Sequence, residues 1–267
     1  MRTPISANTW VDFDDAGQGP PVVLLHAFPL ARAMWQPQVA ALESEYRLLV
    51  PDQRGFGGTS PFGEPPSLDQ MADDVAGLLD ARKLSEPVTL GGLSMGGYVA
   101  LAFARKYPAR LRALVLADTR AEADSPEGRA NREQMIAFAQ THSARDVIDQ
   151  LLPKLLGPET RAHRPEVVDE VRRIAVAQTP AGIIGALRAM RDRPDASPSL
   201  AHIRVPTLVL VGSDDGLTPP AAAEKLAAAI RGARLEKIPG AGHLSNLEQP
   251  ERFNAAVRGF LQSLAAR

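Results

Sequence analysis

The pentapeptide Gly92-Leu93-Ser94-Met95-Gly96 constrains the fold of this chain more than any other segment. Residues 87–91, just before it, read as a short buried strand, and residues 97–105 read as a helix. A serine at so sharp a strand-to-helix turn has its hydroxyl exposed, and the flanking glycines avoid clashes that a Cβ would cause. The free N–H groups and positive dipole end of the helix then favour an oxyanion beside the serine.

The pentapeptide alone has a second interpretation, because a serine in a glycine-rich turn can simply cap the helix. The chain contains 21 glycines, so such a pentapeptide is weak evidence by itself. The strand before it and the helix after it favour a nucleophilic serine. The decision depends on whether an acid and a base follow on suitable elements.

The composition indicates a globular protein and excludes several function classes. With 267 residues, 45% of them hydrophobic, the chain can build a substantial core, as one domain with an insertion or as two domains. A formal net charge of −1 gives no indication of a nucleic-acid or membrane partner, and the oligomeric state, monomer or homodimer, stays open. The absence of cysteine excludes disulfides and thiolate metal sites and fits a cytoplasmic location. Residues 1–8 lack the apolar stretch of a signal peptide, and no apolar run has the length of a membrane span.

Short apolar runs alternate with amphipathic stretches in the first half of the chain. This alternation predicts a mostly parallel sheet with helices on both faces. The expected strands are 10–13, at an edge, then 21–26, 47–51, 87–91 and 111–117. The expected helices are 32–44, 68–82 and 95–107.

Residues 121–200 break this pattern, because they contain no convincing strand. Four helices are expected there, near 126–141, 144–156, 165–178 and 180–191. The alternation then resumes with strands at 206–212 and 234–238 and helices at 220–230 and 249–264. The simplest interpretation is an α/β core of residues 1–120 and 201–267, interrupted by a helical cap over 121–200. A helical linker is the alternative, but the length of the insertion favours a lid over a site.

An acid and a base for Ser94 are expected just after late strands, since ligands sit at the carboxyl ends of parallel strands. Two carboxylates, Asp214 and Asp215, follow strand 206–212, and His243 follows strand 234–238. A neutral histidine can take the serine proton near neutral pH, and a carboxylate holds the required tautomer. The order Ser, Asp, His is that of the nucleophile-elbow hydrolases, and it predicts a catalytic triad.

Five segments together resemble the α/β-hydrolase fold family over essentially the whole chain. They are His26-Ala27-Phe28-Pro29, Asp52-Gln53-Arg54-Gly55-Phe56-Gly57, Gly92-Leu93-Ser94-Met95-Gly96-Gly97, Gly212-Ser213-Asp214-Asp215-Gly216-Leu217-Thr218-Pro219 and Gly242-His243. The family's Gly-x-x-Asp-x-x-x-Pro pattern implies Asp215 as the acid. Asp214 is the alternative, unless it is a turn residue that bonds its own backbone. The resemblance implies no cofactor and no metal.

The resemblance also implies an oxyanion hole made by the backbone N–H groups of Phe28 and Met95. Ala27 departs from the family here, since its position is commonly glycine and its methyl group restricts φ. His26 is an alternative base, but its place directly after an early strand favours a role in bracing the loop. The turn Arg54-Gly55-Phe56-Gly57 resembles a structural element rather than a catalytic one.

A serine nucleophile argues against the haloalkane dehalogenases and epoxide hydrolases of this fold, which attack with a carboxylate. The elbow 92–97 and the segment 242–251 most resemble carboxylesterases and 3-oxoadipate enol-lactonases. This resemblance implies a serine esterase for small acyl esters, with an enol-lactonase-like lactone hydrolase as the alternative. Further alternatives are a cofactor-free haloperoxidase or perhydrolase, a C–C bond hydrolase, and a slow hydrolase that acts as a ligand receptor.

Two sets of residues in or next to the insertion bear on the substrate. A lactonase that acts on a dicarboxylate needs a cation, and the candidates are Arg120, Arg129, Arg132 and Arg188, although surface arginines are the default. Apolar residues of the insertion are candidates for an acyl pocket, but we expect most of them to pack helices together. These are Met135, Ile136, Phe138, Ile183, Ile184, Leu187 and Met190.

Overall fold

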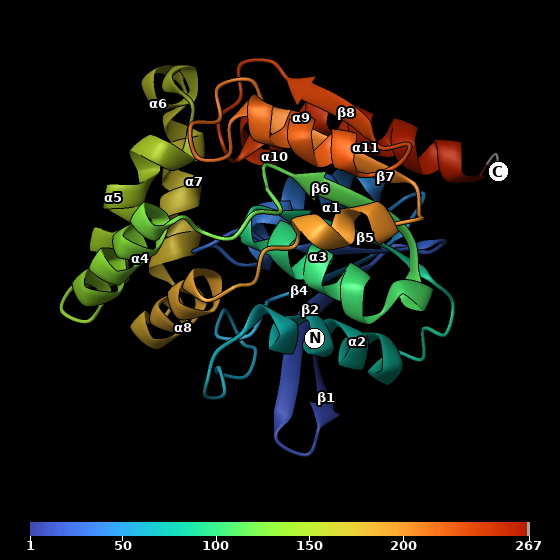
Figure 1. The fold of residues 1–267 in the computed structure, drawn as a ribbon, viewed down its shortest axis with the longest axis horizontal. Helices are drawn as coiled ribbons and strands as arrows, with labels where there is room; N and C mark the ends of the chain where they lie inside the picture. Colours follow the sequence, from blue (N-terminus) through green and yellow to red (C-terminus); the bar gives the residue numbers. More distant parts are fainter. Residues whose placement is uncertain (266–267) are drawn as a thin grey trace.

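The computed structural model describes residues 1–265 and shows one eight-stranded sheet with helices on both faces (Figure 1). The strands are β1 (Arg2–Ser6), β2 (Thr9–Ala16), β3 (Pro21–Leu25), β4 (Arg47–Pro51), β5 (Val88–Leu93), β6 (Leu111–Ala117), β7 (Thr207–Gly212) and β8 (Arg234–Ile238). The helices of the core are α1 (Gln36–Leu42), α2 (Leu68–Ala81), α3 (Met95–Lys106), α9 (Pro220–Ala229), α10 (Ser245–Glu248) and α11 (Pro250–Ala265). Short 3-10 helices are η1 (Arg32–Trp35), η2 (Pro108–Arg110) and η3 (Ser197–His202).

The strand order is β1-β2-β4-β3-β5-β6-β7-β8, and every pair from β4 to β8 along this order is parallel. This confirms the predicted mostly parallel sheet. Alternate residues of β3 enter two different cores, because successive side chains of a strand point to opposite faces. Val23 and Leu25 pack with α2 and α3, whereas Val22 and Leu24 pack with α1 and α11. Helices therefore bury both faces of the strand beside β5.

The structure corrects two expectations about single elements. The strand at 10–13 is not an edge strand, because β1 pairs with β2 and takes the edge. β1 is only partly buried, so its sequence carries little of the apolar alternation that marks a strand. The expected helix 32–44 divides into η1 and α1, with Pro37 in the first turn of α1. The expected helix 249–264 corresponds to α11, and the short helix α10 precedes it.

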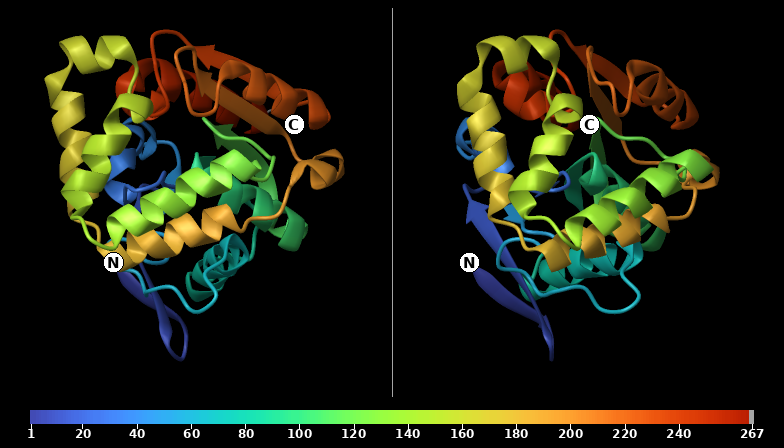
Figure 2. Two further views of the ribbon diagram at one scale, coloured as in Figure 1. Left: turned by 60° about the vertical axis from the view of Figure 1, so that its left-hand side comes forward. Right: turned by 90° about the vertical axis from the view of Figure 1, so that its left-hand side faces the viewer.

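Five α-helices rather than four lie between β6 and β7, and we call them the cap helices. They are α4 (Pro126–Ala139), α5 (Ala144–Leu155), α6 (Pro158–His163), α7 (Pro165–Val176) and α8 (Pro180–Arg191). The additional helix, α6, is too short to show a periodic apolar face. The cap helices lie together beside the core, with α4 along α8 and α5 along α7 (Figures 1 and 2). Serine N-caps begin two of them: the Ser125 hydroxyl accepts from the Gly128 N–H, and Ser143 forms a capping box with Asp146.

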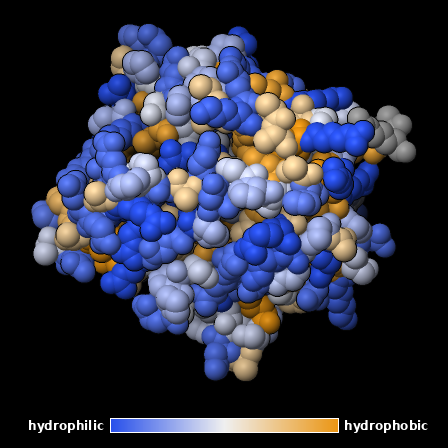
Figure 3. Space-filling model, viewed as in Figure 1, coloured by the Kyte–Doolittle hydropathy of each residue, from blue (hydrophilic) through white to orange (hydrophobic). Residues whose placement is uncertain are grey.

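Hydrophilic residues cover most of the face seen in Figure 1, and hydrophobic residues gather there in smaller groups (Figure 3). Within residues 1–265, none of the helices combines the length and the apolarity that crossing a bilayer requires. The cytoplasmic location stays a prediction.

Candidate active site

Ser94 stands between β5 and α3 in a strained backbone conformation. Its φ of +55° and ψ of −112° are uncommon for a residue with a side chain, and such strain gathers at functional sites. Two contacts to the end of β6 hold the turn. The Ser94 N–H donates to the Ala117 carbonyl (2.9 Å), and the Thr119 hydroxyl donates to the Ser94 carbonyl (2.9 Å).

The glycines around Ser94 leave the space that this turn needs. A Cβ on Gly92 would lie 2.2 Å from the Gly96 carbonyl oxygen, and a Cβ on Gly96 would lie 2.2 Å from the Leu25 carbonyl oxygen. A Cβ on Gly97 would lie 2.5 Å from the Thr119 hydroxyl oxygen. A side chain at any of these positions would force the turn apart, so the glycine pattern follows from close backbone approach.

His243 lies between Ser94 and Asp215. Its Nε2 is 2.8 Å from the Ser94 Oγ, and its Nδ1 is 2.8 Å from the Asp215 Oδ2. When Nδ1–H donates to the carboxylate, Nε2 is free to accept the serine proton. Asp214, by contrast, is exposed, and its carboxylate accepts from the Ser213 hydroxyl at 3.1 Å. The structure thus brings Ser94, His243 and Asp215 together and leaves Asp214 outside this group.

Asp215 is held by groups of its own turn. Its Oδ1 accepts from the N–H groups of Leu217 (2.8 Å) and Thr218 (2.9 Å), and its Oδ2 accepts from the Thr218 hydroxyl (2.6 Å). Burial alone raises the pKa of this carboxyl, but the charge and hydrogen bonds of His243 and the Thr218 bonds lower it, so the pKa lies below its usual value. Asp215 is therefore an ionised partner for the imidazole at neutral pH.

The environment of His243 stabilises its protonated form. Burial alone lowers the pKa of His243, but the negative charge of Asp215 and its hydrogen bond outweigh burial. The charge of Glu248 acts in the same direction, as does that of Asp118 once it is ionised, so the pKa of His243 is raised above 6.5. An imidazole in this setting is well suited to take a proton from the Ser94 hydroxyl.

Of the two residues predicted for the oxyanion hole, Phe28 lines the same cavity as Ser94, and Met95 directly follows Ser94. Met95 is the first residue of α3, so its N–H lies at the positive end of the helix dipole. Within residues 1–265, the N–H groups of Phe28 and Met95 donate no hydrogen bond. Ala27 is fully buried and its N–H donates to the Met34 sulfur at 3.1 Å.

A cavity of about 510 Å³ opens above Ser94, between the core and the cap helices. Phe28, Thr218 and His243 line it from the core, and the apolar cap residues that line it are Met135, Phe138, Leu151, Leu155, Leu187 and Met190. Four of the apolar residues expected in the insertion, Met135, Phe138, Leu187 and Met190, thus face this space. Ile136 and Ile183 instead pack in the core.

Comparisons with known proteins agree with this geometry. The family model described as alpha/beta hydrolase fold matches residues 20–250. The chain belongs to this family. Among curated proteins, 3-oxoadipate enol-lactonase 1 of Acinetobacter baylyi is 30% identical over 255 residues, which are 95% of this chain and 93% of that protein.

Two solved structures of α/β hydrolases extend the comparison. A thermophilic esterase from Thermogutta terrifontis, with malate bound, has a TM-score of 0.93 and 41% identity over 96% of this chain and 94% of its own. The enol-lactonase from Burkholderia xenovorans LB400 has a TM-score of 0.89 and 32% identity over 96% of this chain and 98% of its own. The protein is accordingly an α/β hydrolase whose relatives include esterases and enol-lactonases.

His26 has both ring nitrogens engaged in this α/β hydrolase. Its side chain is fully buried, its Nε2 accepts from the Gln53 N–H (2.9 Å), and its Nδ1 donates to the Ala27 carbonyl (3.0 Å). Burial also lowers the pKa of His26. His26 therefore braces the loop that carries Phe28 and has no free nitrogen with which to act as a base.

Three guanidinium groups surround one buried carboxylate beside the cavity. Asp124 pairs with Arg120 (2.8 Å), Arg132 (2.5 Å) and Arg193 (2.9 Å). Arg120 and Arg132 also line the cavity, whereas the other two candidate cations, Arg129 and Arg188, do not. This wall of the cavity thus carries more positive than negative charge.

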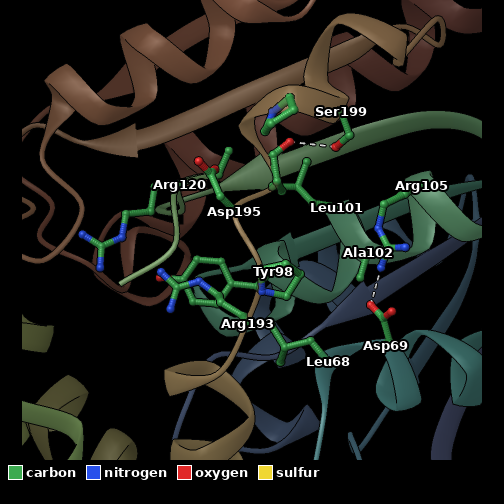
Figure 4. A pocket seen from close by; sticks show the side chains of 14 residues that line it. Leu68, Asp69, Tyr98, Leu101, Ala102, Arg105, Arg120, Arg193, Asp195 and Ser199 are labelled. Carbon is green, nitrogen blue, oxygen red and sulfur yellow. Dashed lines mark hydrogen bonds and ion pairs between the residues drawn. The ribbon is translucent and has the colours of Figure 1, made fainter. Parts of the chain in front are cut away.

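A second hollow of about 380 Å³ shares Tyr98 and Arg120 with the cavity above Ser94 (Figure 4). The Arg193 guanidinium lies 4.2 Å from the centre of the Tyr98 ring, a cation–π contact between two residues that line this hollow. At the far end of the hollow, Arg105 pairs with Asp69 (2.5 Å). The charged groups that Figure 4 shows are thus already engaged with protein partners.

The sequence interpretation missed Asp118, Thr119 and Thr218, all of which hydrogen-bond to the segments of Ser94, Asp215 or His243. Asp118 and Thr119 directly follow β6, just as Asp215 and His243 follow β7 and β8. A search for polar residues directly after the strand at 111–117 would have found Asp118 and Thr119.

Proposed function

We propose that the protein is a serine hydrolase that cleaves carboxylic esters, with small acyl esters favoured. The observation that carries this proposal is the hydrogen-bonded series from Ser94 Oγ through His243 to Asp215, at the floor of a cavity. A serine hydroxyl becomes a competent nucleophile when an adjacent oriented base takes its proton. The esterase and enol-lactonase names of its relatives support the same reaction class.

The acylation step follows from the positions of these atoms. As the Ser94 Oγ attacks the ester carbonyl carbon, His243 Nε2 accepts the hydroxyl proton, and Asp215 stabilises the imidazolium. The N–H groups of Phe28 and Met95 donate to the developing oxyanion. The imidazolium then gives its proton to the leaving alkoxide, which departs as an alcohol and leaves an acyl-enzyme on Ser94.

The deacylation step uses the same groups with water as the nucleophile. His243 takes a proton from the water while the oxygen attacks the acyl carbonyl, and it returns the proton to Ser94. This cycle involves no cofactor and no metal. We further propose that residues 121–200 act as a cap, since apolar side chains of α4, α5 and α8 face the space above Ser94 and suit a short acyl group.

Turnover of p-nitrophenyl butyrate, together with labelling by a fluorophosphonate, tests the proposal. We expect hydrolysis with covalent labelling at Ser94, located by peptide mass spectrometry. An enzyme that is slow but labels at Ser94 would favour the receptor alternative. The absence of both turnover and labelling would rule out a serine hydrolase.

A specific observation also favours the second candidate, hydrolysis of a lactone that carries a carboxylate. The surplus of guanidinium groups around Asp124 places positive charge on the cavity wall, where a substrate carboxylate gains a charge-assisted bond. We propose that Arg120 makes this contact, because about a third of its side chain is exposed while it lines the cavity.

Replacing Arg120 separates the two candidates. Arg120→Gln is expected to lower kcat/KM for a carboxylated enol-lactone by about 10- to 100-fold, the loss of one charged hydrogen bond. The same variant should hydrolyse p-nitrophenyl butyrate nearly as well as the wild type. Arg129→Gln is the matched control, since Arg129 lies outside the cavity. An equal loss on both substrates, or none on the lactone, would contradict a carboxylate-binding role.

A further inference from the structure

The end of β6 touches all three segments that carry the proposed triad. The Ala117 carbonyl and the Thr119 hydroxyl hold the main chain of Ser94, as described above. Asp118 lies between them, and its own N–H donates to the Leu210 carbonyl on β7 at 2.9 Å. Its side chain contacts the loops that carry the acid and the base.

The Asp118 carboxyl group joins these two loops. Its Oδ1 accepts from the Gly212 N–H at 2.8 Å, and its Oδ2 lies 2.5 Å from the Ser245 Oγ. Gly212 ends β7 three residues before Asp215, and Ser245 follows His243 by two residues. Asp118 and Ser245 are both fully buried, so water does not compete for these bonds.

Asp118 is also strained, with a φ of +46°. A residue with a side chain adopts this conformation only when its surroundings impose it, and asparagine and aspartate tolerate it best after glycine. The left-handed backbone conformation directs the carboxyl group of Asp118 between the two loops, where it makes both hydrogen bonds. We propose that Asp118 is a positioning residue that holds the loops of Asp215 and His243 at the separation their hydrogen bond requires.

The charge state of Asp118 follows from its surroundings. No lysine or arginine pairs with it in residues 1–265, and the titratable groups that face it are Asp215 and His243. Burial, with the charge of Asp215, raises the pKa of Asp118 to about 8. Asp118 is therefore largely protonated at neutral pH, and its Oδ2 accepts from the Ser245 hydroxyl.

Two substitutions test this role, which rests on the proposed serine hydrolase function. Asparagine keeps both bonds, because its oxygen accepts from Gly212 and its amide donates to Ser245, so Asp118→Asn should keep kcat close to the wild type at pH 7. Asp118→Ala loses both bonds, and its kcat should fall about 100-fold with little change in KM, as expected for a displaced catalytic group. Circular dichroism and thermal unfolding measure the folded fraction of each sample, so that a loss of folded protein is not read as a loss of kcat.

The pH dependence gives a readout that mere structural support would not move. The wild-type profile of kcat/KM should contain a step near pH 8 that Asp118→Asn lacks, because asparagine does not ionise. Stability should respond as well: the unfolded chain ionises Asp118 near pH 4, below the folded chain, so rising pH between 4 and 8 favours unfolding. The difference in Tm between Asp118→Asn and the wild type should therefore shift in favour of the variant as the pH rises from 4 to 8.

Asp214→Asn is the control for both measurements, since it neutralises an exposed neighbour of Asp215 and should follow the wild type at every pH. Identical pH profiles and a constant Tm difference for Asp118→Asn would overturn the neutral carboxyl. Loss of kcat in Asp118→Asn, or full kcat in Asp118→Ala, would overturn the positioning role. If Asp118→Ala does not fold, Asp118→Asn still decides. A wild type without hydrolase activity would refute the proposed function, while the Tm series would still test the charge state of Asp118.

Discussion

Ser94→Ala is expected to lower kcat on p-nitrophenyl butyrate by about 10⁵- to 10⁶-fold, the cost of removing a nucleophile that acts with its base as a unit. KM should change little, because the cavity walls that contact the substrate remain. The fold should also remain, since the turn is held by the main chain of Ser94 through Ala117 and Thr119. Thermal unfolding of the variant checks this expectation, and initial rates at high enzyme concentration measure the residual activity.

Ser263→Ala is the matched control for this experiment. Ser263 lies on α11, and its hydroxyl donates to the Phe260 carbonyl of the same helix, far from the cavity. It should keep wild-type activity and so show that a serine-to-alanine change outside the cavity does not lower the rate. A Ser94→Ala enzyme with activity comparable to this control would refute the proposed mechanism.

The residues proposed for catalysis were accessible from the sequence because each follows a strand of a parallel sheet. Strand ends at one edge of such a sheet lie close together whatever the intervening chain does. The position of Ser94, Asp215 and His243 directly after three such strands therefore indicated that they lie close together in space. The glycines of the elbow also indicated a tight turn, because only glycine fits where the backbone segments approach so closely.

Other features depend on tertiary contacts that no local pattern reveals. Asp118 becomes a link between two loops only because β7 lies beside β6 and places Gly212 next to it. The grouping of Arg120, Arg132 and Arg193 around Asp124 joins residues from a loop, α4 and the segment after α8. In the sequence, the first two arginines were not distinguishable from Arg129 and Arg188, because exposure and charge pairing are set by the packing of the cap helices.

The choice between the two adjacent aspartates shows where a motif and a structure give different kinds of support. The spacing pattern of the family favours Asp215, and the structure gives a physical reason. Asp215 is buried and bonded to His243 and Thr218, whereas Asp214 is exposed and contacts Ser213. Which carboxylate supports catalysis is a question for a pair of matched substitutions.

Asp215→Asn is expected to lower kcat by about 10⁴-fold, the loss seen when a triad carboxylate becomes an amide. The amide can donate to His243 Nδ1, which then favours the tautomer with the proton on Nε2, facing Ser94. That proton blocks the nitrogen that must accept the serine hydroxyl proton, and the neutral amide no longer stabilises the imidazolium. Asp214→Asn removes the same charge one residue away and should keep kcat within about threefold, as for an exposed group without a buried partner. Equal losses in the two variants, or the larger loss at Asp214, would contradict Asp215 as the acid, and steady-state rates of both proteins at pH 7 and 8 distinguish these outcomes.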